Sequence, residues 1–292
     1  KIKGLYVQGE NPAMSDPDQI HSRKALAKLE HLVVQDIFMT ETAWNADIIL
    51  PASAHAEKTG TYTNTNRQVQ IGRAVVEPPK EVRQDWWIIQ EIAKRMGLGW
   101  DYKSPKDIFD EMKLVMPSLD NISWERLEKD NHVTYPVKSE LIPGEDIIFT
   151  NGFPTSNNLA KIIPVNLINP NDELNSDFPL ILSTGRLLEH WHTGTMTRRA
   201  VVLNELEPDP MIFMSQVDSN FYNLDLNKSV IIETRRGKIS IKIRHDDDLL
   251  PGMIFLPFCF KEAAANILTN SDLDPIGKIP ELKFSAARVY QN

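Results

Sequence analysis

Apolar and polar positions follow two different patterns along the chain, and the first belongs to residues 1–100. Apolar runs of strand length stand at 2–8 (IKGLYVQ), 31–36 (HLVVQD) and 47–50 (DIIL), separated by segments of helical character. In 84–97 (QDWWIIQEIAKRMG), apolar residues recur at helical spacing and the run ends on a glycine, which predicts an amphipathic helix. Strand–helix–strand units of this kind predict an open, mainly parallel sheet that takes ligands at the carboxyl ends of its strands.

Two further helices have recognisable starts. Asp16 with Pro17 at the first helical position predicts one helix, and Ser104 with Pro105 predicts another over 104–116. Residues 60–72 (GTYTNTNRQVQIG) alternate as strands do after a Gly-Thr turn.

The second pattern begins near residue 177 and is that of short strands. Apolar runs of strand length occur at 179–185, 211–215, 229–245, 252–258 and 283–290. The 229–245 run alternates on both sides of Arg236-Gly237, which predicts a hairpin. Several short strands over about 110 residues predict a small barrel.

Proline and asparagine are frequent between the two patterns, so we expect no long regular element there. The predicted organisation is an α/β domain over 1–116, an extended connector over 117–176 and a β domain over 177–292.

Composition narrows the class of protein. The 292 residues carry 32 basic and 40 acidic side chains, a net charge of −8, which disfavours non-specific binding to nucleic acid or to an anionic membrane. No apolar run approaches the ~18 residues of a membrane span. A single cysteine, Cys259, excludes an internal disulfide framework and any all-cysteine zinc or iron–sulfur site. We therefore predict a cytoplasmic protein with neither nucleic acid nor membrane as a partner.

The chain opens at Lys1 without an initiating Met and passes at once into a strand-like run. This start is typical of the interior of a longer protein, and a processed or trimmed chain is the alternative.

The residues from Arg186 to Arg199, RLLEHWHTGTMTRR, concentrate hydrogen-bond donors directly after an apolar strand. Backbone N–H groups and Arg186 at that position can hold a phosphate. His190 and His192 would face the same way on an extended segment, a spacing that also suits two metal ligands, but no third ligand is in view. A polyanion-binding loop and a polar barrel rim remain equally open.

In the α/β part, the segments QGENP and QD follow predicted strands. Asp36 suits ribose hydroxyls or a guanine edge, and a helix cap is the alternative for it. Lys58 before Gly60-Thr61 can approach a phosphate, whereas Asp85 by itself predicts a cap. The chain has neither a P-loop nor a Rossmann glycine fingerprint, and nothing resembles a nucleophile elbow. The residues alone predict two domains that share a phosphorylated ligand.

Five blocks, taken together, resemble one family: GLYVQGENP, VVQDIFMTETAWNADIILPA, EKTGTYTNTNRQVQ, LSTGRLLEHWHTGTMTRR and PFCFKEAAANILTNSDLDPIGKIPELKFSAARV. In this order they resemble the carboxy-terminal half of molybdopterin oxidoreductases. Within that family they are most similar to the catalytic alpha subunit of cytoplasmic, NAD-dependent molybdenum formate dehydrogenases.

The resemblance implies a fold and a cofactor. Part of a Rossmann-like mononucleotide-binding α/β domain would be followed by a six-stranded double-psi β-barrel that binds molybdopterin dinucleotide. The cofactor would be molybdenum, or tungsten in some relatives, held between two molybdopterin guanine dinucleotides.

The resemblance also implies the residues that contact the cofactor. Asp36 would bind the guanosine, and His190 and His192 would lie beside the pterin instead of binding a metal. The full set is Asn11, Gln35, Asp36, Lys58, Asp85, Thr184, Gly185, Arg186, Leu187, Leu188, Glu189, His190, Trp191, His192, Thr193, Phe258, Asn266 and Lys283.

The family's catalytic residues would lie upstream of this sequence. The metal-binding cysteine or selenocysteine, a histidine, an arginine and the iron–sulfur cysteines have no counterpart here, and Cys259 does not match that ligand. The implied reaction is reversible oxidation of formate to CO2, with electrons passing through iron–sulfur clusters to NAD on a flavin-binding partner subunit. We expect this segment alone to be inactive.

Two alternative hypotheses for the function remain open. Nitrate reductases have barrel loops similar to TGR…EHWHTG, and the upstream metal ligand would separate them from formate dehydrogenases. A separately encoded, non-catalytic module that binds the dinucleotide is the second alternative.

Overall fold

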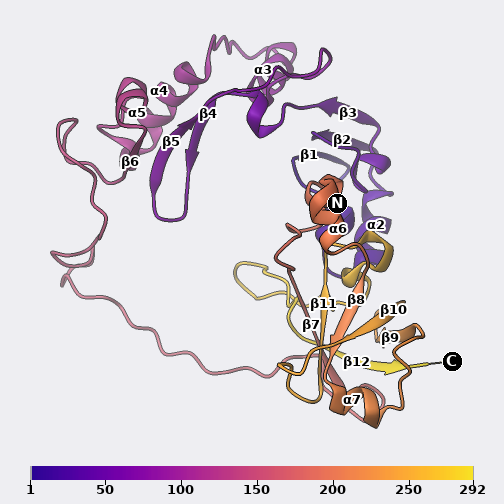
Figure 1. Ribbon diagram of the computed structural model, residues 1–292. Coiled ribbons are helices and arrows are strands. Elements are labelled where there is room, and N and C mark those ends of the chain that lie inside the picture. Colours follow the sequence, from indigo (N-terminus) through magenta and orange to yellow (C-terminus); the bar gives the residue numbers. More distant parts are fainter. Residues whose placement is uncertain (1, 292) are drawn as a thin grey trace. The chain divides into compact units, whose positions relative to one another are not determined.

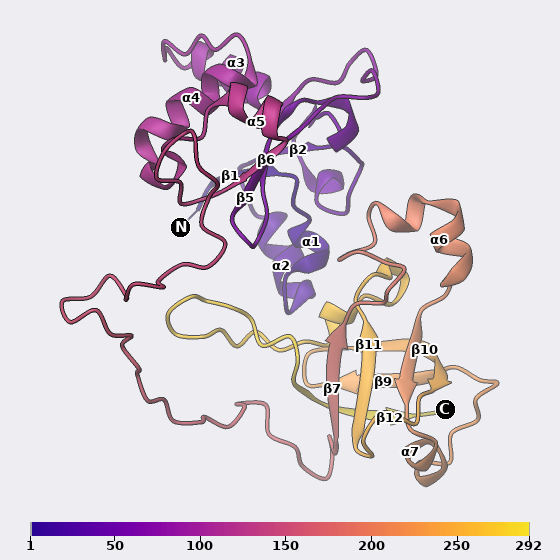
Figure 2. The same cartoon turned by 60° about the vertical axis from the view of Figure 1, so that its left-hand side comes forward.

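The structure, a computed structural model, describes residues 2–291 and divides into two compact units. One unit comprises the chain up to Ile49 together with everything from Leu167 onward, and the other runs from Leu50 to Asn166. Figures 1 and 2 show the chain coloured along its sequence.

A small three-stranded sheet stands near the amino-terminal end of the described residues. Strand β1 (Gly4–Gln8) pairs in parallel with β2 (His31–Asp36), and β3 (Ile48–Pro51) completes the order β1-β2-β3. The buried side chains of Val7, Leu32, Val34 and Ala43 form its core. The predicted parallel sheet is confirmed for β1 and β2, whose carboxyl ends lie at one edge.

The helix expected to start at Asp16 begins later. Helix α1 (Pro12–Ser15) ends where the N–H of Asp16 donates to the carbonyl of Pro12 at 3.2 Å. Asp16 precedes Pro17 and is therefore held in extended backbone, and Asp18 is left-handed with φ 44°. Helix α2 (Gln19–Leu26) begins only after Asp18, so the predicted start was wrong by two residues.

Six strands of the first unit close into a barrel, which confirms the predicted small barrel. They are β7 (Leu180–Gly185), β8 (Met211–Met214), β9 (Val230–Thr234), β10 (Lys238–His245), β11 (Met253–Pro257) and β12 (Ser285–Tyr290), in the order β10-β8-β11-β7-β12-β9. Strand β7 runs parallel to β11, and β9 pairs with β10 in the predicted hairpin. Fully buried side chains such as Leu182, Ile212 and Ile254 fill the interior.

Short helices occupy the connections of the barrel. They are η4 (Thr197–Arg199), α6 (Val201–Leu206), α7 (Gln216–Phe221), η5 (Lys261–Ala263) and η6 (Ala265–Ile267). Helix α7 starts where Ser215 accepts a hydrogen bond from the N–H of Asp218 at 3.1 Å. The hydrophobic pattern did not predict these elements, because one or two turns are too short to establish a helical period.

The second unit combines an antiparallel sheet with three helices. Strands β4 (Gly60–Thr63), β5 (Gln68–Gly72) and β6 (His132–Thr134) form the sheet. Helices α3 (Asp85–Arg95), α4 (Pro105–Val115) and α5 (Trp124–Asp130) accompany it, with short turns η2 (His55–Glu57) and η3 (Pro117–Leu119). A further turn, η1 (Ala43–Asn45), precedes β3 in the first unit. Residues 135–179 form no helix or strand.

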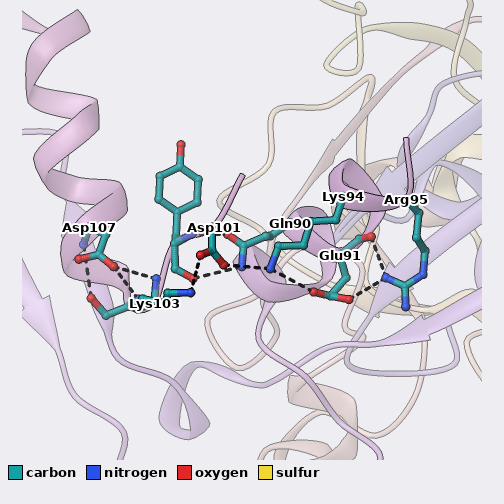
Figure 3. A network of polar contacts seen from close by, with 9 residues as sticks. Gln90, Glu91, Lys94, Arg95, Asp101, Lys103 and Asp107 are labelled. Carbon is teal, nitrogen blue, oxygen red and sulfur yellow. Dashed lines mark hydrogen bonds and ion pairs between the residues drawn. The ribbon is translucent and has the colours of Figure 1, made fainter. Parts of the chain in front are cut away.

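Polar side chains connect the end of α3 with the start of α4 in the second unit, as Figure 3 shows. Arg95 donates to Glu91 at 2.7 Å, and Lys94 reaches Asp101 at 3.3 Å. Lys103 pairs with Asp101, and Asp107 accepts from the backbone N–H of Lys103 at 2.7 Å. Ser104 caps α4 as predicted. Each basic side chain of this network has a carboxylate partner.

Within residues 2–291, no helix is both long enough and apolar enough to cross a lipid bilayer.

Candidate functional site

A cavity of about 310 Å3 lies at the carboxyl ends of β7 and β11. Seven of the residues predicted from the sequence line it: Thr184, Arg186, His192, Thr193, Phe258, Asn266 and Lys283. Met14, Ser15 and Leu282 complete the lining without having been predicted. The cavity belongs entirely to the first unit.

The pairing of two parallel strands brings the lining together. Gly185 stands opposite Pro257 in the β7–β11 register, so the residues that follow, Arg186 and Phe258, emerge at the same end of the barrel. Gly185 also meets a packing requirement, since a Cβ there would lie 2.4 Å from the ring of Phe255. The strand end is therefore closely packed, and the side chains just beyond it face the cavity.

Two basic side chains give the cavity its charge. Arg186 lies 5.5 Å from the ring of Trp191 and 5.8 Å from that of Phe258, and its Nη2 donates to Nε2 of His192 at 3.2 Å. Lys283 donates to the carbonyl of Thr184. In the described part of the chain neither has a carboxylate within ion-pair distance, and no acidic residue lines the cavity. Such a site attracts an anion.

The two histidines do not face the same way, and that expectation was wrong. His192 has a left-handed backbone with φ 47°, which interrupts the extended geometry on which the expectation rested. His192 lines the cavity, whereas His190 is 1% exposed and lies outside the lining. His190 instead contacts the carbonyl of Glu207 and the hydroxyl of Thr197.

The other predicted residues of the segment 186–199, hereafter the arginine loop, take different positions. The side chain of Leu188 is almost fully exposed, and Trp191 contacts Arg186. Leu187, Glu189 and Trp191 do not contribute to the lining, nor does Gly185 before them.

Asn266 connects the barrel with the end of α1. Its Nδ2 donates to the carbonyls of Ser15 at 2.7 Å and Met14 at 3.2 Å. These bonds bring Met14 and Ser15 into the cavity wall. The sequence offered a partial signal, since both residues follow the loop at the end of the first strand, but their contact with Asn266 spans about 250 residues and has no local signature. Leu282 is adjacent to the predicted Lys283.

Three predicted residues, Asn11, Gln35 and Asp36, lie at the carboxyl edge of the β1–β2 sheet and do not line the cavity. Asn11 donates to Glu41 at 2.7 Å and accepts from the hydroxyl of Thr42 at 2.8 Å. Gln35 is buried and accepts from the hydroxyl of Tyr6. Asp36 accepts from the N–H of Ile37 at 2.7 Å and is not the helix cap that the sequence left open as an alternative, since the next helical turn, η1, begins only at Ala43.

The remaining predicted residues, Lys58 and Asp85, lie in the second unit and form an ion pair with each other there. Both side chains are about three-quarters buried.

Cys259 has the properties of a structural residue. Its side chain is buried, and burial raises the pKa of its thiol to about 12, so it stays protonated at neutral pH. Among residues 2–291, no three His, Cys, Asp or Glu side chains gather so as to hold a metal ion.

The lining fits a phosphorylated, partly aromatic ligand. Arg186, Lys283 and Thr193 can donate hydrogen bonds, and Phe258 offers an aromatic face. A volume of about 310 Å3 stands at the lower end of the ~300–1,000 Å3 range of small-molecule pockets, so it accommodates one portion of a dinucleotide and not the whole.

Comparison with known proteins agrees with this chemistry. Residues 1–95 match the model of the molybdopterin oxidoreductase family, and residues 180–286 match that of the molybdopterin dinucleotide-binding domain. The chain is 44% identical to the F420-dependent formate dehydrogenase subunit alpha of Methanocaldococcus jannaschii, over 99% of this chain and 43% of that protein. The assimilatory nitrate reductase catalytic subunit of Bacillus subtilis is 32% identical over 99% of this chain and 42% of its own length.

Among solved structures, acetylene hydratase from Pelobacter acetylenicus has a similar fold, with a TM-score of 0.77 and 21% identity, covering 99% of this chain and 44% of that one. The chain thus spans less than half the length of these relatives. Its two matched regions are a molybdopterin oxidoreductase domain over residues 1–95 and a molybdopterin dinucleotide-binding domain over residues 180–286, and a formate dehydrogenase alpha subunit is among its relatives.

Proposed function

We propose that the barrel cavity binds part of a molybdopterin guanine dinucleotide and that the whole protein oxidises formate reversibly to CO2. The observation that carries this proposal is the pair of cations, Arg186 and Lys283, that line the cavity and have no acidic partner among residues 2–291. The match to the dinucleotide-binding domain covers both residues, and a formate dehydrogenase relative is 44% identical.

The residues of the lining would each contribute to holding the cofactor. Arg186 and Lys283 compensate the negative charge of a pyrophosphate group. His192 keeps the Arg186 guanidinium in place, because its Nε2 accepts a hydrogen bond from that group. Phe258 packs on an aromatic ring system, and Thr193 adds a hydroxyl donor. When bound, the cofactor supplies the redox chemistry, and the protein supplies its orientation and electrostatic surroundings.

The more distant predicted contacts remain part of the proposal. Asn11, Gln35, Asp36, Lys58 and Asp85 are proposed to contact the dinucleotides from the domain over residues 1–116. The residues that bind the metal, orient formate and hold iron–sulfur clusters are proposed to lie in the additional length of the relatives.

We propose an electron-transfer subunit as partner and the cytoplasm as location. The family resemblance implied NAD as the final acceptor, whereas the 44% identical relative is F420-dependent, which supports F420 as the first acceptor to test. Nitrate reduction is the second candidate function, because one relative, 32% identical, is an assimilatory nitrate reductase catalytic subunit.

Kinetics of the full-length protein test the proposal. The protein would be purified from a host that makes the cofactor and supplied with formate and either F420 or NAD. The proposal expects formate-dependent reduction of one acceptor and no consumption of nitrate when a reduced dye is offered. Nitrate consumption without formate oxidation would identify a nitrate reductase, and bound cofactor without either activity would identify a binding module.

A further inference from the structure

His190 is the most buried side chain of the arginine loop, yet it does not line the cavity. It is 1% exposed, and both of its ring nitrogens have partners. Nε2 lies 2.8 Å from the carbonyl oxygen of Glu207, and Nδ1 lies 3.3 Å from the hydroxyl oxygen of Thr197. Since both nitrogens are engaged within the protein, the ring is not available to a ligand.

The partners determine which nitrogen carries the proton. A carbonyl oxygen only accepts, so Nε2 of His190 is the protonated nitrogen and donates to Glu207. The hydroxyl oxygen of Thr197, which lies beside Nδ1, also accepts the backbone N–H of Trp191 at 3.0 Å. A continuous series of hydrogen bonds therefore runs from Glu207 through His190 and Thr197 to the backbone of Trp191.

One end of this series is fixed to the barrel. The carboxylate of Glu207 accepts two hydrogen bonds from Arg244 of β10, at 2.8 and 2.9 Å. Such a bidentate pair restricts both side chains more than a single contact does. The ring of His190 also meets the edge of Phe260, which follows β11, with centroids 5.7 Å apart.

The other end reaches the cavity. The indole of Trp191 lies 5.5 Å from the guanidinium of Arg186, which lines the cavity. The position of Trp191 therefore influences where Arg186 presents its charge.

We propose that His190 is a positioning residue that ties the arginine loop to the barrel through Glu207 and thereby holds Arg186 at the cavity. The effect on ligand binding rests on the proposed function, whereas the effect on the loop does not. The two histidines, two positions apart, thus have separate roles: His192 contacts Arg186 directly, and His190 acts through Thr197 and Trp191.

Two substitutions of similar size test this role in the full chain. His190→Gln keeps one amide donor for Glu207 and one oxygen acceptor for Thr197, whereas His190→Leu fills the space without either. Thr197→Val removes the hydroxyl from a less buried position and serves as a second variant if His190→Leu does not fold. His21→Ala, at an exposed histidine of α2, is the matched control.

Two measurements distinguish the role of His190 in the arginine loop from the proposed binding of a ligand in the cavity. Hydrogen exchange of the Trp191 amide measures the loop, and calorimetry with inorganic pyrophosphate measures the cavity. We expect His190→Leu and Thr197→Val to speed exchange and weaken pyrophosphate binding by about 10-fold each, while His190→Gln stays within about threefold of the parent.

Unchanged exchange in both His190→Leu and Thr197→Val would overturn the positioning role, and so would a His190→Gln chain that behaves like His190→Leu. If the parent chain fails to bind pyrophosphate, the cavity assignment is contradicted, and the exchange data still decide the role of His190.

Discussion

The basic residues of the cavity and those of the α3–α4 network differ in what surrounds them. Arg95, Lys94 and Lys103 all lie within ion-pair distance of Glu91 or Asp101 (Figure 3). Arg186 and Lys283 have no such partner in the described residues and are surrounded by aromatic rings, a histidine and a backbone carbonyl. The basic side chains of the α3–α4 network are therefore neutralised by carboxylates of the protein, whereas those of the cavity remain available to an anion.

The ion pairing in the α3–α4 network lowers the pKa of its carboxylates. Hydrogen bonding from Arg95 lowers the pKa of Glu91, and hydrogen bonds from Lys103 and Lys94 lower the pKa of Asp101. Exposed pairs of this kind contribute little to stability, because water and salt screen them. Cations that face a cavity without a carboxylate partner can attract an anionic ligand. The barrel cavity is therefore a better candidate for the binding site than the α3–α4 network.

The largest expected effect comes from removing the cavity's charge. Arg186→Ala with Lys283→Ala in the full-length protein should weaken cofactor binding by about 100-fold or more, since each charge-assisted contact is worth about 1.5–3 kcal/mol. Metal analysis and pterin fluorescence of the purified protein measure this loss. Lys94→Ala with Arg95→Ala is the control and should leave cofactor content unchanged. Equal cofactor content in the two double variants would contradict the claim that the cations of the cavity, unlike those of the α3–α4 network, hold the cofactor.

A smaller effect is expected from the backbone that shapes the arginine loop. Gly194 has φ 73°, and a Cβ there would lie 2.6 Å from the carbonyl oxygen of Cys259. Gly194→Ala should therefore lower the free energy of unfolding by about 2 kcal/mol, measured by urea denaturation. Gly99→Ala is the control, since a Cβ at that position meets nothing within 4 Å. A stability equal to the parent's would show that the loop adapts without strain.

The smallest effect is expected in the ion-pair network. Asp101 has a lowered pKa, so its contribution is present above its ordinary pKa of 3.8 and is lost as the pH falls through the lower folded value. Asp101→Asn should lower the urea midpoint slightly at neutral pH, and the difference should disappear in about 1 M salt, where the Debye length is about 3 Å. A salt-independent loss would indicate packing instead of charge.

Local sequence patterns predicted where helices and strands form better than they predicted which strands pair with each other. The alternation on both sides of Arg236-Gly237 was enough to predict the β9–β10 hairpin, and the capping motif at Ser104 predicted the start of α4. The residues at 60–72 were recognised as strands, but their pairing with β6 in a separate antiparallel sheet depends on residues 132–134, far along the chain.

The candidate site shows the same limit. Arg186 and Lys283 were predicted because basic side chains stand beside strands in blocks that resemble one family. The burial of His190 against Glu207 and the contact of Asn266 with Ser15 follow from tertiary packing, which no local spacing encodes. The left-handed backbone at His192 reversed an expectation based on extended geometry, because a histidine gives no sequence signal for that conformation.

The structure of the cofactor-loaded, full-length protein tests the cavity assignment most directly, through the distance from Arg186 and Lys283 to the nearest cofactor atom. We predict that a phosphate or pterin atom lies within about 2.7–3.2 Å of each side chain's terminal nitrogens. A cofactor bound elsewhere, with both side chains facing solvent, would contradict the proposal that this cavity is part of the dinucleotide-binding site.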